Sequence, residues 1–91
     1  SGTTTYYYQA QDWALAEALQ KGVVQQLGTS NVGVKRGNIY VLRNTSMPAA
    51  LVEVGFLSHQ GEADLLSQQW YRLEAARGMF NGILNYFMQL E

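Results

Sequence analysis

Hydrophobic and polar positions follow a helical period over two long segments of the chain. In residues 13–27, apolar side chains recur every three or four positions, with Asp12 placed as an N-cap and Gly28 as a C-terminal stop. Residues 70–90 repeat the pattern more cleanly, with apolar side chains at Leu73, Ala76, Phe80, Ile83 and Phe87. Two amphipathic helices are predicted, and the second is expected to bury a wide face.

Three shorter segments carry strand signals. Residues 4–8 are β-branched and aromatic, and residues 39–45 form a short apolar run after a polar, glycine-bearing loop at 28–38. Residues 49–57 are apolar at both odd and even positions, which point to opposite faces of a strand. This pattern is typical of a central strand covered on both faces of a parallel sheet. A turn and a short helix are expected at 58–69.

The predicted order is strand, helix, strand, strand, helix, helix. This order indicates an α/β domain with a partial twisted sheet flanked by helices. Three or four strands are few for two such long helices, so part of the sheet is expected to lie outside the 91 residues.

Composition narrows the function classes. The net charge of −1 argues against a dedicated nucleic-acid binder, which needs a basic field to displace counterions from phosphates. The chain has no cysteine, hence no disulfide or thiolate metal site, and no apolar run approaches the length of a membrane span. Lys21, Lys35, Arg36 and Arg43 fall in an interval without acidic residues, and they are either solvated surface charges or a basic approach to an anionic group.

Glu53 is the main candidate for chemistry because it interrupts an apolar run, "MPAALVEVGF". An ionised carboxylate that leaves water needs a partner, a shifted pKa, or access to solvent and substrate. Near the carboxyl end of a strand, a half-buried glutamate is placed to act as a general acid or base. The structural alternative is an ion pair with Arg43 or Lys35.

Other candidates are weaker. His59 is the only histidine, so a two-histidine zinc site cannot form within the chain, and Ser58 and Asp64 lack the sequence context of a hydrolase triad. Three consecutive tyrosines at residues 6–8 are interpreted as sheet packing, with stacking on sugars as the alternative.

The long motif "YVLRNTSMPAALVEVGFLS", preceded by "GTTTYYY" and a helix and followed by a long terminal helix, carries a family resemblance. Over almost all of its length, the chain resembles the C-terminal half of the zinc-dependent N-acetylmuramoyl-L-alanine amidases, the Amidase_3 family of bacterial cell-wall hydrolases. On this resemblance, residues 1–91 are the C-terminal portion of one amidase catalytic domain.

The resemblance implies a zinc-activated water that cleaves the amide between N-acetylmuramic acid and L-alanine in peptidoglycan, with Glu53 as the general acid/base. It also implies export to the periplasm or cell wall. The family's zinc ligands, two histidines and a glutamate, come from the N-terminal half, so none is expected here and His59 is given no ligand role. The isolated chain is therefore expected to be inactive.

Two further expectations follow. The alternative to a peptidoglycan hydrolase is a non-catalytic module that uses the amidase scaffold to bind peptidoglycan or a partner protein. A piece of a domain that leaves a sheet edge and apolar faces uncovered is also expected to self-associate, as a dimer or a swapped oligomer.

Overall fold

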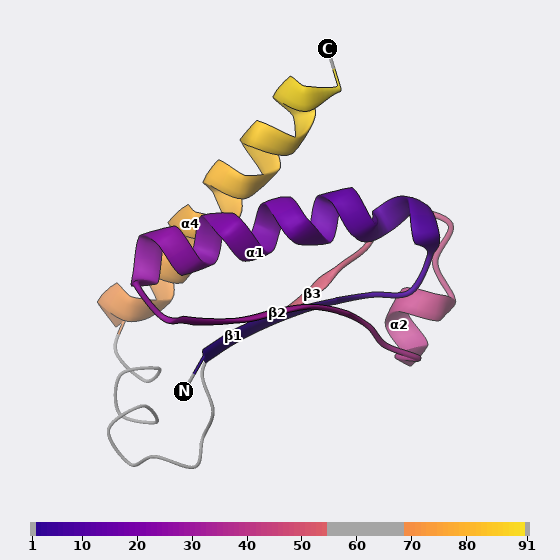
Figure 1. Ribbon diagram of the computed structural model, residues 1–91, viewed down its shortest axis with the longest axis horizontal. Coiled ribbons are helices and arrows are strands. Elements are labelled where there is room, and N and C mark those ends of the chain that lie inside the picture. The colour runs from indigo at the N-terminus through magenta and orange to yellow at the C-terminus, as the bar shows by residue number, and fades with distance from the viewer. Residues whose placement is uncertain (1, 55–68, 91) are drawn as a thin grey trace.

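The computed structural model describes residues 2–54 and 69–90, which form a three-stranded sheet and two long helices (Figure 1). The elements in chain order are β1 (Gly2–Tyr7), the short 3-10 helix η1 (Ala10–Asp12), α1 (Trp13–Leu27), β2 (Ser30–Arg36), α2 (Tyr40–Arg43), β3 (Leu51–Val54) and α4 (Gln69–Gln89). The predicted α/β class, the first strand and both long helices are confirmed. The short helix expected within 58–69 falls almost wholly outside the described residues.

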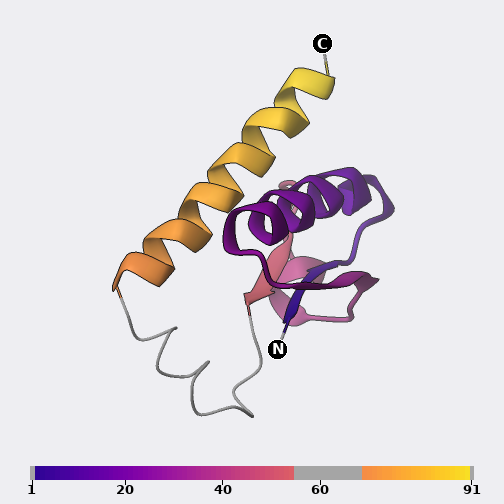
Figure 2. The same ribbon diagram turned by 60° about the vertical axis from the view of Figure 1, so that its left-hand side comes forward.

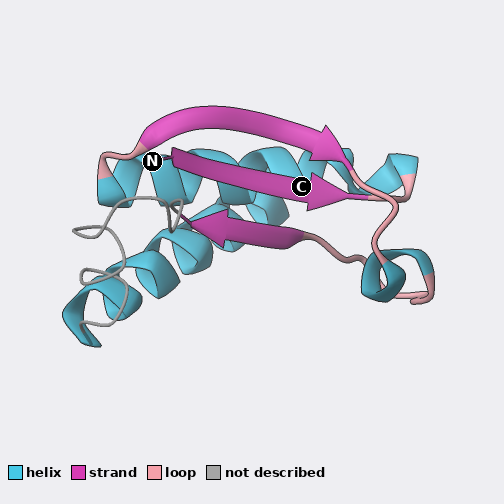
Figure 3. Ribbon diagram, turned by 90° about the horizontal axis from the view of Figure 1, so that it is seen from below, coloured by secondary structure: helices cyan, strands magenta, loops and turns pink. Residues whose placement is uncertain are grey.

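The sheet has the order β2-β1-β3, with β1 in the centre. β1 pairs in parallel with β2 through the crossover helix α1, and it pairs antiparallel with β3. Figure 3 shows α1 and α4 on the same face of the sheet, behind the three strands in that view. Within the described residues, α1 covers this face of the sheet and α4 packs on α1, and neither long helix lies on the other face.

The segment predicted as a loop at 28–38 contains strand β2. Its polar residues and glycines mimic a turn signal, but Val34 is half-buried and the strand is held by pairing with β1. Between Thr3 and Thr4 the register shifts, which leaves Val32 as an extra residue, and Gly33 at this irregularity has φ of 119°. A positive φ is open to glycine and strained for other residues, so Gly33 makes this bulge possible.

The segment predicted as a strand at 39–45 is instead the one-turn helix α2. The backbone N–H and the side-chain amide of Asn44 both donate to the carbonyl oxygen of Tyr40, at 3.0 Å and 2.9 Å. Only Leu42 of this helix is buried, while Tyr40 and Val41 are exposed. A short apolar run does not distinguish strand from helix by periodicity, which explains why this prediction was wrong.

The core is small and centres on α1. Its buried apolar side chains within the described residues are Ala16, Leu19, Val23, Leu42 and Ala75. Gly28 ends α1 in the left-handed conformation, with φ of 68°, as predicted. Asp12 occupies the N-cap position, but its buried carboxylate makes no capping bond and accepts instead from the backbone N–H of Ala49, at 3.3 Å. That bond ties the start of α1 to the segment that enters β3.

α4 packs against α1, as Figure 2 shows, and the two helices approach each other closely at backbone atoms. A Cβ atom on Gly78 would lie 2.8 Å from the carbonyl oxygen of Gly22, and one on Gly82 would lie 2.5 Å from that of Ala18. The apolar stripe predicted to be buried is exposed, with Leu73 at 54% and Phe80 at 65%. The helix was predicted correctly, but it packs on α1 through small residues on its other face.

Candidate functional site

Glu53 lies on β3, and the pairing with β1 fixes where its side chain points. Glu53 pairs with Thr4, whereas its neighbours Val52 and Val54 pair with Thr5 and Thr3. The Thr5 hydroxyl bonds Gln20 of α1, and side chains directly opposite each other in a sheet share a face. Val52 and Val54 therefore face α1, and Glu53 faces the other side of the sheet.

The surroundings of Glu53 differ from both predictions made for it. Its side chain is exposed rather than half-buried. Within the described residues it forms no ion pair, so the predicted pairing was wrong: the Arg43 guanidinium donates to the side-chain oxygen of Asn38 at 2.7 Å, and Lys35 lies on β2, beyond the central strand. Among the described residues, the carboxylate is thus exposed and without an ion-pair partner.

β3 also runs in the direction opposite to that expected. The prediction placed Glu53 at the carboxyl end of a parallel sheet, but β3 is an antiparallel edge strand within the described residues. Its last described residue, Val54, pairs with Thr3 at the amino end of β1. The end of the sheet that holds Glu53 is therefore the end at which β1 begins, and the carboxyl ends of β1 and β2 lie at the opposite end.

No metal site forms within residues 2–54 and 69–90, where no group of three histidine, cysteine or acidic side chains comes together. His59, Ser58 and Asp64 lie outside the described residues. In the same described ranges, neither long helix has an apolar stretch long enough for a bilayer crossing. Glu53 is the one predicted site residue that the structure places.

The tyrosines at the end of β1 and the nearby basic residues pack against each other. The Arg36 guanidinium lies 4.5 Å from the ring centroid of Tyr8, and its Nε donates to the Tyr8 carbonyl oxygen at 2.9 Å. All three tyrosines are half-buried. The structure therefore favours packing over sugar stacking as the role of Tyr8. The basic side chains of this region do not gather around Glu53.

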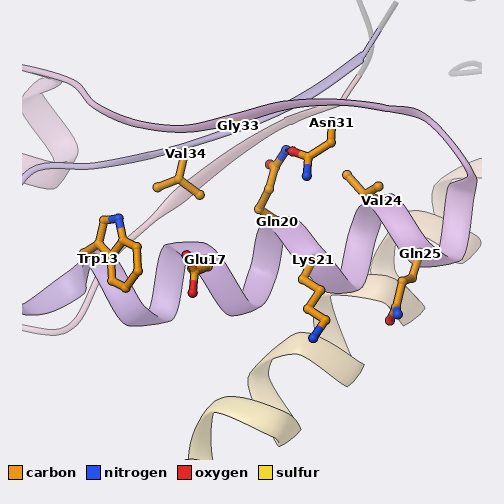
Figure 4. Close-up of a pocket in the computed structure, with 9 residues that line it drawn as sticks. All are labelled: Trp13, Glu17, Gln20, Lys21, Val24, Gln25, Asn31, Gly33 and Val34. Carbon is orange, nitrogen blue, oxygen red and sulfur yellow. The ribbon is translucent and has the colours of Figure 1, made fainter.

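A groove of about 580 Å³ runs between α1 and β2, and sequence reasoning missed it (Figure 4). Its lining residues are Trp13, Glu17, Gln20, Lys21, Val24, Gln25, Asn31, Gly33 and Val34. β2 forms its wall, so the groove lies across the central strand from Glu53. It is a separate feature of the surface and contributes nothing to the surroundings of Glu53.

The floor of this groove is a buried polar network around Gln20. The Gln20 amide donates to the Thr3 carbonyl oxygen and to the Asn31 side-chain oxygen, each at 2.7 Å, and its own oxygen accepts from the Thr5 hydroxyl at 2.8 Å. Figure 4 shows Gln20 and Asn31 turned toward each other between α1 and β2. Gln20 lies four residues after buried Ala16, so the helical spacing could have identified it as an inward-facing polar residue.

Comparison with known proteins places this arrangement in a family. Residues 1–85 match the family model described as N-acetylmuramoyl-L-alanine amidase. The chain is 36% identical, over 96% of its length, to the N-acetylmuramoyl-L-alanine amidase LytC of Bacillus subtilis strain 168, of which it covers 18%.

Solved amidase structures share the fold. The catalytic domain of CwlV, an N-acetylmuramoyl-L-alanine amidase from Bacillus (Paenibacillus) polymyxa var. colistinus, is similar with a TM-score of 0.86 and 36% identity over 94% of this chain and 48% of that one. The CwlD amidase of Clostridioides difficile, solved in complex with the GerS lipoprotein, gives a TM-score of 0.87 and 32% identity over 96% of this chain and 46% of that one. The chain thus spans about half the length of these solved relatives.

Proposed function

Because the chain belongs to the N-acetylmuramoyl-L-alanine amidase family, we propose that it is part of a peptidoglycan hydrolase. The proposed reaction is cleavage of the amide between N-acetylmuramic acid and L-alanine, at the cell wall or in the periplasm. The family match over residues 1–85 and the likeness to solved amidase catalytic domains support this proposal. Half of the length of those domains has no counterpart here, so the activity is proposed for a complete domain and the 91 residues alone are expected to be inactive.

Glu53 is the residue we propose as the general acid/base. In this role its carboxylate accepts a proton from the water that attacks the amide carbonyl, and then passes that proton to the departing amine nitrogen. The single observation that carries the role is that Glu53 is exposed and has no hydrogen-bond or ion-pair partner among the described residues. A strand holds its backbone through pairing with Thr4, which positions the carboxylate while leaving it accessible.

Zinc is proposed as the cofactor of the complete domain, on the family resemblance. The described residues do not supply its ligands, because no group of three histidine, cysteine or acidic side chains comes together among them. A protein zinc site commonly uses three or four nitrogen, sulfur or oxygen ligands, so these ligands must come from outside the described residues. Glu53 is accordingly assigned a proton-transfer role and no ligand role.

A non-catalytic module that binds peptidoglycan or a protein partner is the second candidate. The observation that favours it is that no group of three histidine, cysteine or acidic side chains comes together within the described residues. Such a module would fold alone and bind cell-wall material without turnover.

The substitution Glu53→Gln in a complete amidase domain that contains these residues separates the two candidates. Loss of a general acid/base is expected to lower the rate of muropeptide hydrolysis by about 10²–10⁴-fold. Binding to purified peptidoglycan should persist, because the neutral amide keeps the size of the side chain. Glu17→Gln, which removes an exposed carboxylate on α1, is the control and should leave the rate unchanged. Unchanged hydrolysis in Glu53→Gln would reject the catalytic role.

A further inference from the structure

The groove between α1 and β2 has the size and the apolar surface of a ligand site. Its volume of about 580 Å³ lies within the range of roughly 300–1,000 Å³ that is typical of small-molecule sites. Trp13 opens α1 and is 45% exposed, so much of its indole ring is uncovered. Half-buried Val24 and Val34 add apolar surface from α1 and from β2. The groove therefore suits a ligand with one apolar face, which an aromatic ring can cover.

The floor of the groove presents one hydrogen-bond donor in a fixed direction. The side-chain nitrogen of Gln20 donates to the Thr3 carbonyl oxygen, and the same nitrogen donates to the Asn31 side-chain oxygen. Asn31 therefore directs its oxygen toward Gln20 and its amide nitrogen, Nδ2, elsewhere. Asn31 is exposed, and among the described residues its Nδ2 donates to no protein acceptor. The buried Gln20 network thus holds a free amide donor ready for a ligand.

The charges of the groove argue against an ionic ligand. Its described lining carries one acidic residue, Glu17, and one basic residue, Lys21, so the two charges balance. Figure 4 shows Lys21 extending from α1 away from β2, toward the outside of the groove. Polyanions such as nucleic acids need clustered cations. A neutral polar molecule, with an apolar face and hydrogen-bonding groups, fits this lining better than an anion or a cation.

We propose that this groove binds an N-acetylated saccharide. The apolar C–H face of a pyranose ring would pack on the indole of Trp13, and the ring hydroxyls would remain in contact with water. The acetamido carbonyl would accept a hydrogen bond from Asn31 Nδ2, while the acetamido methyl group packs on the apolar surface of Val24 or Val34. The acetamido group supplies the acceptor and the methyl group together, which a plain hydroxylated sugar does not.

The groove is separate from the site of the proposed reaction. It lies on the α1 face of the sheet, between α1 and β2, whereas Glu53 lies across β1 and faces the other side. A sugar in the groove is therefore not the one whose amide is cleaved. The glycan strand of peptidoglycan is its source, so the assignment rests on the proposed function. A second attachment to the same polymer raises the effective concentration of substrate at the catalytic site.

Tryptophan fluorescence tests this proposal, because Trp13 and Trp70 are the only two tryptophans of the chain. Trp70→Phe leaves Trp13 as the single reporter, and titration with chitotetraose, an oligomer of N-acetylglucosamine, should change its emission with a saturating curve. Cellotetraose, which has hydroxyl groups in place of the acetamido groups, should bind at least about tenfold more weakly. In calorimetry, Trp13→Ala should lower the affinity for chitotetraose by about tenfold or more.

Trp70→Ala is the matched control, because it removes a tryptophan that is 56% exposed on α4 and does not line the groove. It should leave the affinity unchanged, and circular dichroism checks that both alanine variants keep their helices. An unresponsive Trp13 at millimolar chitotetraose, equal binding of cellotetraose, or undiminished binding by Trp13→Ala would each overturn the proposal. Binding of a stem peptide without chitotetraose binding would also overturn it. These readouts measure binding without turnover, so they fail independently of the proposed hydrolysis by the complete domain.

Discussion

Substitution of Gly82 by alanine tests how closely α1 and α4 approach. An added Cβ atom would lie 2.5 Å from the carbonyl oxygen of Ala18 and 3.0 Å from the Cα atom of Leu19. Both neighbours are backbone atoms of a helix, so neither can rotate away as a flexible side chain would. Relief of the clash requires the two helices to separate.

The size of the effect follows from two opposing terms. Alanine in place of glycine within a helix gains up to about 1 kcal/mol of helix propensity. Forcing an additional carbon into a packed contact typically costs about 1–3 kcal/mol. Because backbone forms the contact, the upper part of that range applies, and Gly82→Ala should lower the free energy of unfolding by about 1–2 kcal/mol. For a domain of this size, each kcal/mol corresponds to a decrease in Tm of about 4–8 °C.

Urea and thermal unfolding followed by helical circular dichroism measure this change, at one fixed protein concentration. Asn81→Ala is the control, since Asn81 is exposed on the same helix and its substitution gains propensity without meeting α1. A Gly82→Ala chain as stable as the unsubstituted protein, or more stable, would show that propensity outweighs the contact and would refute the reasoning.

Three further predictions concern the buried network, assembly and metal binding. Gln20→Ala removes the partner of the Thr5 hydroxyl and should cost about 1–3 kcal/mol in urea unfolding, and Gln20→Glu should also destabilise because a carboxylate cannot donate to the Thr3 carbonyl. In sedimentation velocity at tens of micromolar, the isolated chain should form dimers or larger species, and a monodisperse monomer would contradict this. Calorimetric titration of the isolated chain with zinc should give no heat above the buffer background, whereas tight stoichiometric binding would show that His59 and carboxylates build a site of their own.

The parts of the fold that local signals determine were predictable from the sequence. Gly28 marks the end of α1 because its left-handed conformation is a local property, and the apolar period of residues 70–90 matches the extent of α4. β2 and α2 were misassigned because a few residues of mixed polarity take their structure from pairing and packing. The face that α4 turns toward α1 was also misassigned, since close contact between glycines left its larger side chains outside.

In the candidate site, too, local sequence signals predicted some features, whereas others depend on strand pairing and packing. Glu53 was identified as a carboxylate out of place in an apolar run, and its proposed role came from the family resemblance. Its exposure and lack of a described partner depend on the antiparallel placement of β3, which no local pattern determines. Gln20 was overlooked because the helical pattern was read for apolar residues, although its spacing from Ala16 and Val23 placed it on the buried face.

The Gln20 network has a consequence for the accuracy of strand pairing. Parallel strands joined by a helix form no tight turn that would set their alignment, so β1 and β2 need another means of choosing partners. The Gln20 side chain bonds β1 through Thr3 and Thr5 and β2 through Asn31, and all three bonds form together only in one alignment. A slip of one residue would turn Asn31 to the opposite face and leave the buried amide with an unpaired donor. The network therefore makes a misaligned pairing of β1 and β2 less stable than the native one.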